Sequence, residues 1–281
     1  PAEFYLNENK ENTSNINIYN KKFENKDILD LDNKSFFIKY FSGTDNNFDC
    51  SLNFIHIHEA NFNLEIKINS ELSKKLIYAF NEMKIVKNIY LSSVNAYKEA
   101  TTSYGKAKYI CEEIYRLSEN SIIVRPSTII DIDFDKKLIL GGKKGKSLNS
   151  LNSIIQRSYL IPVPGNGKYL QTICFGSDLG KFLSFIIISN IFDNKTINFF
   201  SGEMISYNEF LNLNFKLKKI KRIKLFIPIF LIFSVLKILN SIFSFKISPK
   251  NIENLINQKI QFDHTDEIIK HMNLKKINND F

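Results

Sequence analysis

The chain has 281 residues, of which 44% are hydrophobic and 24% are charged. This length suits one α/β domain with a smaller lobe, and the composition is that of a folded globular protein rather than a disordered chain. The formal net charge is +9, but most lysines are scattered along the chain, so we do not expect a nucleic-acid partner.

Strands and helices are expected to alternate along the first half of the chain. Five segments have the residue pattern of β-strands: Asn15–Tyr19, Phe36–Phe41, Leu52–His58, Asn88–Ser92 and Ser121–Arg125. An acidic loop separates the first two of them. Two segments, residues 66–84 and 104–117, have apolar residues at helical spacing. This alternation predicts an α/β fold with a doubly wound parallel sheet.

Each predicted helix has one apolar stripe that we expect to face the sheet. The stripe of residues 66–84 consists of Leu72, Leu76, Ala79, Phe80 and Met83. The stripe of residues 104–117 consists of Ala107, Ile110, Cys111, Ile114 and Leu117.

Residues 88–108 combine a buried strand, a polar loop and a helix start. Ser93 follows the strand, at the edge where an open α/β sheet binds its ligands. Tyr104 and Lys108 are four residues apart, so they share one helix face. An ammonium can lower the pKa of a nearby phenol, and a serine can position a substrate oxygen. The three residues therefore predict a proton-transfer site with Tyr104 as general acid or base.

This stretch resembles the active site of the extended short-chain dehydrogenase/reductase family, in particular its NAD-dependent sugar-nucleotide epimerases and dehydratases. The resemblance lies in Leu91-Ser92-Ser93, in Tyr97, and in Tyr104-Gly105-Lys106-Ala107-Lys108. The family's dehydratases carry an Asp-Glu pair after the serine, whereas this chain has Val94 and Asn95. Two residues that do not ionise argue against dehydration and favour epimerisation or carbonyl reduction.

The family's glycine fingerprint, Gly-x-x-Gly-x-x-Gly, would hold the pyrophosphate of NAD or NADP at a helix amino terminus. The first glycine of this chain is Gly43, so the first strand and its glycine loop are missing. Either the chain is truncated, which we favour, or the protein does not bind the cofactor pyrophosphate through a glycine loop. Asn20-Lys21-Lys22 stands where an acidic residue would hold the ribose, so the choice between NAD and NADP stays open.

The segment from His56 to Ala60 resembles the family's Ile-His-Leu-Ala-Ala stretch beside the nicotinamide. The resemblance implies cofactor contacts by His56 and Ala60, with His58 and Glu59 as departures from the pattern. Two histidines and a glutamate could also bind a metal, but no third cluster of ligands accompanies them, so we expect none. Asn69 matches the family's asparagine that braces the active-site strand, and a helix N-cap is the alternative.

Two further segments resemble the family. Arg125-Pro126 resembles the crossing into the substrate lobe and is assigned to the cofactor site. Gly142-Lys143-Lys144-Gly145-Lys146-Ser147 lacks the first glycine of a phosphate-binding loop, so we interpret it as a basic surface loop. Ile161–Gly167 resembles the Pro-x-Pro-Gly-x-Gly turn of relatives. Gln171 follows it and, with Ser93 and Asn95, is assigned to substrate, while Asp178 is interpreted as a charge at a helix start.

We expect a Rossmann-like cofactor domain over residues 1–160 and a mainly substrate-binding lobe over residues 161–281, with some segments returning to the first domain. Thr196–Ser201, a helix from Ser206 and a closing segment over residues 254–274 continue the family's order. Residues 216–245 place a basic cluster before the apolar run Leu225–Leu236, which is too short to span a bilayer. A buried helix is one interpretation, and a peripheral contact with the membrane surface is the other.

The resemblance implies an NAD(P)-dependent epimerase acting at C4 of a nucleotide- or lipid-linked sugar in bacterial surface-polysaccharide synthesis. Tyr104 would take the hydroxyl proton, Ser93 would bind the reacting oxygen, and Lys108 would hold the cofactor ribose and lower the Tyr104 pKa. A 4-keto-sugar reductase and a catalytically silent assembly protein at the membrane surface are the alternatives. Relatives often form homodimers. Scattered cysteines and no visible signal peptide predict the cytoplasm, at the inner face of the membrane if that contact exists.

Overall fold

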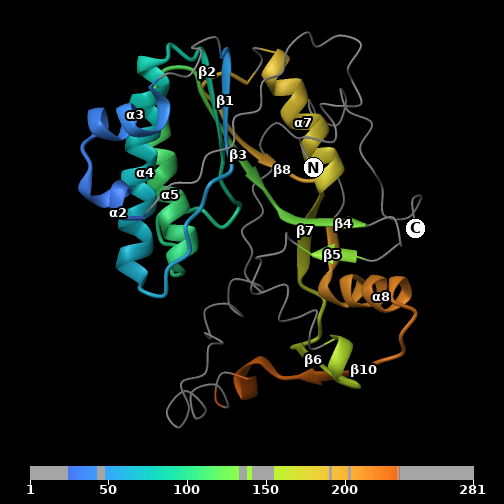
Figure 1. Cartoon of the computed structure of the whole chain (residues 1–281). Helices are drawn as coiled ribbons and strands as arrows, with labels where there is room; N and C mark the ends of the chain where they lie inside the picture. The colour runs from blue at the N-terminus through green and yellow to red at the C-terminus, as the bar shows by residue number, and fades with distance from the viewer. Residues whose placement is uncertain are drawn as a thin grey trace. The chain divides into compact units, whose positions relative to one another are not determined.

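The computed structural model describes residues 25–42, 48–132, 138–140, 155–189, 192–201, 204–232 and 234. The chain divides into two compact units (Figure 1). The first extends to Pro126 and also contains Gly180–Phe199, and the second contains Ser127–Leu179 and the described part of Phe200–Gln261. The chain therefore first crosses between units at Pro126 and later returns to the first unit.

The first unit is built on a parallel sheet whose strands follow the order β1-β2-β3-β8. The strands are β1 (Cys50–Asn53), β2 (Lys87–Leu91), β3 (Ser121–Pro126) and β8 (Thr196–Phe199). Ile122, Ile123 and Val124 are successive residues of β3, so they point to alternate faces, and all three are buried. Both faces of the sheet are therefore covered, as an all-parallel sheet requires.

Helices cover the two faces of this sheet. Figure 1 shows α4 (Phe62–Glu82) and α5 (Ser103–Arg116) on one face and α7 (Gly176–Ile188) on the other. The predicted stripe of α4 is buried in full, and the helix begins at residue 62 because Asn61 accepts a hydrogen bond from Leu64 N. On the other face, Phe182 of α7 stacks on Phe199 of β8 with ring centroids 4.6 Å apart. The prediction of two covering helices at these positions is confirmed.

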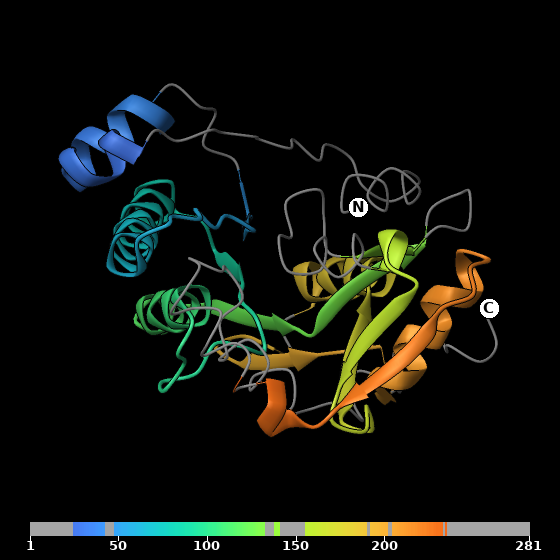
Figure 2. The same ribbon diagram turned by 90° about the horizontal axis from the view of Figure 1, so that it is seen from below.

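The prediction of a strand over Phe36–Phe41 is wrong, and so is that of a loop before it. Residues 25–42 form two helices, α2 (Asn25–Asp30) and α3 (Asn33–Phe41). Asp32 caps α3 by accepting from Ser35 N at 2.7 Å. Phe36 and Tyr40, one turn apart, then share a buried face that packs against α4 (Figure 2). The aromatic run has strand propensity, but packing against α4 decides its conformation.

Two other expectations need correction. The strand predicted over Leu52–His58 ends at Asn53, whose side chain accepts from Ile55 N and donates to the Tyr115 hydroxyl. On α5, Leu117 is 88% exposed, and Tyr115 is buried instead. Ring stacking of Tyr115 on Tyr90 of β2, with centroids 4.5 Å apart, rotates the buried face away from Leu117.

The second unit contains a four-stranded sheet of order β5-β4-β7-β9 and a separate parallel pair, β6 and β10. The strands are β4 (Thr128–Ile132), β5 (Leu138–Leu140), β6 (Leu160–Pro164), β7 (Leu170–Phe175), β9 (Met204–Ser206) and β10 (Ile223–Ile227). The helix expected from Ser206 is α8 (Tyr207–Leu217), which begins with a capping box between Ser206 and Glu209. Gly165 and Gly167 form the predicted turn after β6, with φ values of 58° and 66°.

The apolar run that begins at Leu225 does not begin as a helix. Its first three residues belong to strand β10, which pairs with β6, and a helical turn follows from Pro228, whose carbonyl accepts from Leu231 N. Within the described ranges, no helix is both long and apolar enough to cross a bilayer. The predictions for Asn15–Tyr19, residues 142–147, residues 254–274 and most of residues 233–245 lie outside the described residues.

A buried carboxylate joins α5 to the parallel sheet. Glu112 of α5 is fully buried and receives two hydrogen bonds from Arg125 of β3, at 2.7 and 2.6 Å. Ser92, directly after β2, donates to the same carboxylate at 2.5 Å, and Arg116 donates at 2.8 Å. This bidentate, charge-assisted arrangement fixes the helix against the ends of two strands.

We expect Glu112→Ala to destabilise the chain by about 3–5 kcal/mol, because it leaves the Arg125 guanidinium without its buried partner. Chemical denaturation of the purified chain measures this loss. The matched control is Glu113→Ala on the next residue, whose carboxylate is 52% exposed and pairs with Arg116. The control should cost no more than about 1 kcal/mol, as surface ion pairs do. Equal losses in the two variants would show that Glu112 is not the anchor of α5.

Candidate active site

The predicted serine and tyrosine lie at the carboxyl end of β2 and the amino end of α5. Ser92 N donates to Val124 O and Val94 N donates to Pro126 O, so the chain beyond β2 continues to follow β3. Two tight turns follow, closed by bonds from Ala96 N to Ser93 O and from Ala100 N to Tyr97 O. The helix then begins after Thr102, whose hydroxyl accepts from Gly105 N.

Gly105 allows the helix start to lie directly against the loop. A Cβ at this position would be 2.5 Å from Asn95 O, a distance that real Cβ atoms do not reach. Any other residue would force Asn95 and the first turn of α5 apart. The glycine next to Tyr104 therefore sets the spacing between Ser93, at one end of the loop, and Tyr104 at the other.

The Ser93 side chain lies close enough to the Tyr104 phenol to lower its pKa. The pKa of Tyr104 is nevertheless raised above its ordinary value. Burial is the main cause, the Ser93 side chain opposes it, and the negative charge of Glu65 adds to it. The expectation that the Tyr104 pKa is lowered in this chain is therefore wrong for the protein without ligands.

Lys108 lies deeper than the motif implies. Its ammonium donates to Leu91 O at 2.7 Å and lies 4.7 Å from the ring centroid of Tyr90, and only 3% of the residue is exposed. Burial lowers the Lys108 pKa to about 8. The ammonium therefore braces the last carbonyl of β2 and interacts with the Tyr90 ring. This position explains why the groups that shift the Tyr104 pKa are Ser93 and Glu65.

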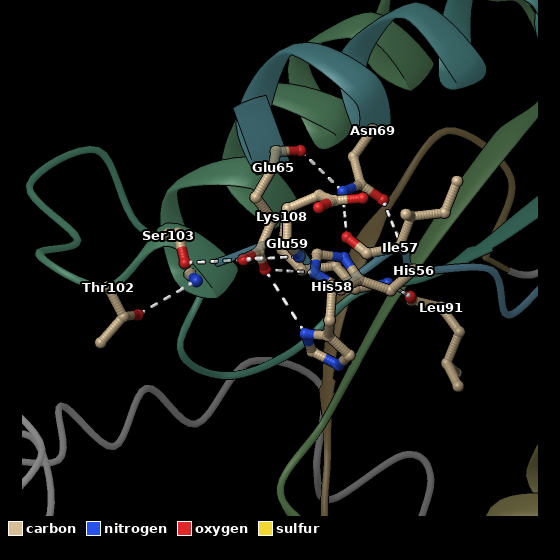
Figure 3. Close-up of polar contacts among 11 residues, drawn as sticks. His56, Ile57, His58, Glu59, Glu65, Asn69, Leu91, Thr102, Ser103 and Lys108 are labelled. Carbon is tan, nitrogen blue, oxygen red and sulfur yellow. Dashed lines mark hydrogen bonds and ion pairs between the residues drawn. The ribbon is translucent and has the colours of Figure 1, made fainter. Parts of the chain in front are cut away.

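The sequence did not predict the group that faces Tyr104, which is formed by His56, His58 and Glu65 (Figure 3). The His56 and His58 rings lie 4.7 and 5.9 Å from the Tyr104 ring, centroid to centroid. Glu65 Oε1 lies 2.8 Å from His56 Nε2 and 3.4 Å from His58 Nδ1. The adjacent carboxylate in the sequence, that of Glu59, was expected with the histidines, but it accepts a hydrogen bond from Asn25 instead.

Hydrogen bonds set the charge of this group. Burial raises the Glu65 pKa, but bonds from His56 and Ser103 outweigh it and hold that pKa below its ordinary value. Burial lowers the His56 pKa to about 4, against the opposing effect of Glu65. At neutral pH the pair is therefore an ionised carboxylate beside a neutral imidazole. The Ser103 hydroxyl donates to Glu65 Oε2 at 2.9 Å, which leaves Oε1 to the histidines.

Asn69 holds the segment that carries the histidines. Its amide accepts from Ile57 N at 2.9 Å and donates to Ile57 O at 2.8 Å and to Glu65 O at 2.7 Å. The alternative of a helix N-cap is wrong, because Asn61 caps α4. Asn69 therefore braces the backbone between His56 and His58, on the same helix as Glu65. A signal existed in the sequence: Glu65 lies one turn before Asn69 on the helix that follows the histidines.

The remaining assigned residues lie at four other positions. Arg125 is engaged by Glu112, and the Pro126 carbonyl accepts from Val94 N. Asn95 N donates to the Ser93 hydroxyl at 3.2 Å. Ala60 is exposed directly before the N-cap of α4, and Gln171 is buried on β7 in the second unit. The cofactor and substrate roles of these residues stay predictions.

The residues present fit the nicotinamide end of NAD or NADP. The hydroxyls of Ser93 and Tyr104 lie near each other at the carboxyl end of a parallel strand, where such sheets bind ligands. In the first unit, no described strand of the sheet is followed by a glycine-rich turn. The described residues therefore do not include a glycine loop that would bind the pyrophosphate.

Solved structures share this fold. One is a UDP-glucuronic acid 4-epimerase from Bacillus cereus in complex with NAD, with a TM-score of 0.56 and 16% identity over 72% of this chain. Another is a dTDP-4-dehydrorhamnose reductase from Bacillus anthracis in complex with NADP, with a TM-score of 0.51 and 15% identity over 64% of this chain. A third, RMD from Pseudomonas aeruginosa complexed with NADPH, has a TM-score of 0.57 and 11% identity over 81% of this chain.

The matches cover 67%, 66% and 83% of those three chains, respectively. No protein-family model and no curated protein matches the sequence. At these identities the likeness is one of fold. It confirms the prediction of an α/β, Rossmann-like architecture for this chain.

Proposed function

We propose that the chain is an NAD(P)-dependent enzyme of the extended short-chain dehydrogenase/reductase family that epimerises C4 of a nucleotide- or lipid-linked sugar, in bacterial surface-polysaccharide synthesis. The observation that carries the proposal is the position of Ser93, just after the carboxyl end of β2, beside Tyr104 in the first turn of α5. Structures of the same fold include a 4-epimerase and a 4-dehydrorhamnose reductase, each solved with a nicotinamide cofactor.

In this reaction the chain binds the sugar oxygen and moves its proton. Ser93 donates a hydrogen bond to the C4 oxygen, and Tyr104, in its phenolate form, accepts the hydroxyl proton as the carbonyl forms. A nicotinamide cofactor, when bound, would supply the hydride chemistry at C4 in both directions, which allows reduction of the 4-keto sugar on its other face. Tyr104 then returns the proton to the same oxygen. Lys108 donates a hydrogen bond to the carbonyl of Leu91, the last residue of β2. It is also the residue that the resemblance assigns to the cofactor ribose.

A 4-keto-sugar reductase is the second candidate, and one observation favours it. A Tyr104 pKa above its ordinary value keeps the phenol protonated. A protonated phenol is ready to donate to a carbonyl oxygen, which is the direction of reduction. The two candidates differ in their use of cofactor, because an epimerase regenerates its cofactor in each turnover and a reductase consumes it.

A catalytically silent member of the family is the third candidate. The Lys108 ammonium is bonded to Leu91 O and buried, and Glu65 places negative charge beside Tyr104. Both features work against ionisation of the phenol. The homodimer implied by the resemblance stays a prediction for all three candidates.

The exposed surface of β10 and the turn after it supports a peripheral contact with an anionic membrane. Between 43% and 67% of each large apolar side chain in this group is exposed: Ile223, Leu225, Phe226, Phe230 and Leu231. Lys219 and Lys221, directly before the strand, are exposed as well. Apolar side chains beside cations suit the interface of a membrane that contains anionic lipid.

Tyr104→Phe should lower kcat on the sugar substrate by at least about 100-fold, because proton transfer by a positioned side chain contributes about 10²–10⁴-fold. Turnover is measured on a panel of nucleotide-linked hexoses and 4-keto sugars, with cofactor consumption followed in parallel. Tyr109→Phe removes a hydroxyl from the same helix and is the control, with unchanged kcat. Full activity of Tyr104→Phe on every substrate that the wild type converts would contradict both the epimerase and the reductase proposals.

Calorimetric titration with NAD and NADP separates the enzymes from the silent member. We expect the intact chain to bind one of the two cofactors with a dissociation constant in the micromolar range, about −8 kcal/mol. AMP serves as the control for binding through the adenosine part alone. If neither NAD nor NADP binds, the silent member becomes the better description, whatever the outcome for membranes.

Membrane contact predicts binding to vesicles that contain phosphatidylserine and none to vesicles of phosphatidylcholine alone. Reversing two charges, in Lys219→Glu with Lys221→Glu, should weaken sedimentation with the anionic vesicles at least about tenfold, since each cation contributes about 1 kcal/mol. The control reverses Lys67 and Lys98, two exposed lysines of the first unit. Equal losses in the two double variants would assign the effect to net charge alone and remove this surface from the proposal.

A further inference from the structure

We infer that His56, His58 and Glu65 form a binding site for a divalent transition metal ion of the Zn²⁺ class. Each residue offers one ligand atom, and the three atoms lie within 4.8 Å of one another. This site is independent of the proposed enzymatic function, since it is defined by metal affinity alone. The site lies beside Tyr104, but Tyr104 is not one of its ligands. The proposed metal site is therefore separate from the Ser93 and Tyr104 hydroxyls.

The distances between the ligand atoms already approach those of a coordinated ion. Tetrahedral Zn²⁺ with bonds of about 2.0–2.2 Å separates neighbouring ligand atoms by about 3.3 Å. Glu65 Oε1 lies 2.8 Å from His56 Nε2 and 3.4 Å from His58 Nδ1. All three ligand atoms lie within 4.8 Å of one another, so coordination requires the most separated of them to move closer together. Two imidazoles and one carboxylate also leave the fourth position open to water, as in catalytic zinc sites.

The surrounding residues position the ligands as an outer shell does around a metal. Ser103 donates to Glu65 Oε2 at 2.9 Å and the Glu59 amide approaches it at 3.4 Å, so the second oxygen is occupied and Oε1 faces the histidines. Asn69 binds both the NH and the CO of Ile57, between the two histidines. Such outer bonds orient ligands and raise metal affinity.

The exposure of the three side chains gives the ion a route into the site. Glu65 and His56 are 4% and 7% exposed, whereas His58 is 50% exposed. An ion can therefore enter from solvent past His58 and reach two buried ligands. Imidazole ligands select Zn²⁺, Co²⁺, Ni²⁺ or Cu²⁺ over Mg²⁺ and Ca²⁺, which prefer oxygen.

One feature limits the expected affinity. Coordination through Nε2 places the His56 ring proton on Nδ1, which is buried and has no hydrogen-bond partner among the described residues. Metal-bound histidines usually donate this proton to an outer acceptor, and loss of such a bond costs about 10–100-fold in affinity. We therefore expect a micromolar site rather than the much tighter binding of structural zinc.

The test is a competition titration of the chain with Zn²⁺ and a chromophoric chelator, repeated with Co²⁺ for its absorption spectrum and with Mg²⁺ as a negative control. We expect one ion per chain and a Co²⁺ spectrum of four-coordinate form. His58→Ala and Glu65→Gln should each weaken Zn²⁺ binding more than tenfold. Ser103→Ala should weaken it by a smaller factor, because it removes an outer bond only.

Matched controls separate this site from other ligands in the chain. Glu59→Gln removes a neighbouring carboxylate that bonds Asn25, and Cys50→Ser removes a partly exposed thiol. Both should retain wild-type affinity. His58 is half-exposed, so its variant should fold, and circular dichroism checks this. Unchanged Zn²⁺ affinity in His58→Ala, or no Zn²⁺ binding by the wild type, overturns the inference.

Discussion

The buried carboxylate of Glu112 is the constraint on which the candidate site depends. A carboxylate without contact to water is stable only when its oxygens are paired, and here Arg125, Arg116 and Ser92 pair them. These partners come from a strand, from the helix itself and from the residue after a second strand. The helix that carries Tyr104 and Lys108 is thereby held in one position along the strand ends. The position of Ser93 relative to α5 therefore depends on an ion pair that does not include Ser93 or Tyr104.

Most of the architecture was predictable because its signals are local. Strand β3 and helices α4 and α5 have apolar patterns long enough to decide between strand and helix. Phe36–Phe41 was too short for such a decision. A short aromatic run fits both the strand period and the helical period, and the contact with α4 that decides between them cannot be read from the run itself. The prediction that Leu117 is buried was wrong for a related reason. The stacking of Tyr115 on Tyr90, a contact between residues distant in the sequence, sets the rotation of α5 about its axis. Contacts of that kind leave no period in the sequence.

The candidate site divides in the same way. Ser93 and Tyr104 lie in one strand–loop–helix unit, so their spacing was enough to predict that they lie near each other, whereas the Lys108 ammonium bonds Leu91 O instead. Glu65 belongs to a different helix, and the bonds from Asn69 to Ile57 help to hold the histidine segment against that helix. The direction of the Tyr104 pKa was missed because it depends on that remote carboxylate and on burial. A motif gives the identity of the acid or base, and its environment gives the charge.

The contact between Gly105 and the Asn95 carbonyl also limits how this loop can vary in length. The loop is fixed at its first residues, where Val94 N bonds Pro126 O, and at its end, where the helix start leaves no space for a side chain. Within the turn from Tyr97 to Ala100, Lys98 and Glu99 are exposed, whereas Ala100 packs against Gly105. Insertions are therefore most easily accommodated at Lys98 and Glu99, while both ends of the loop keep their geometry.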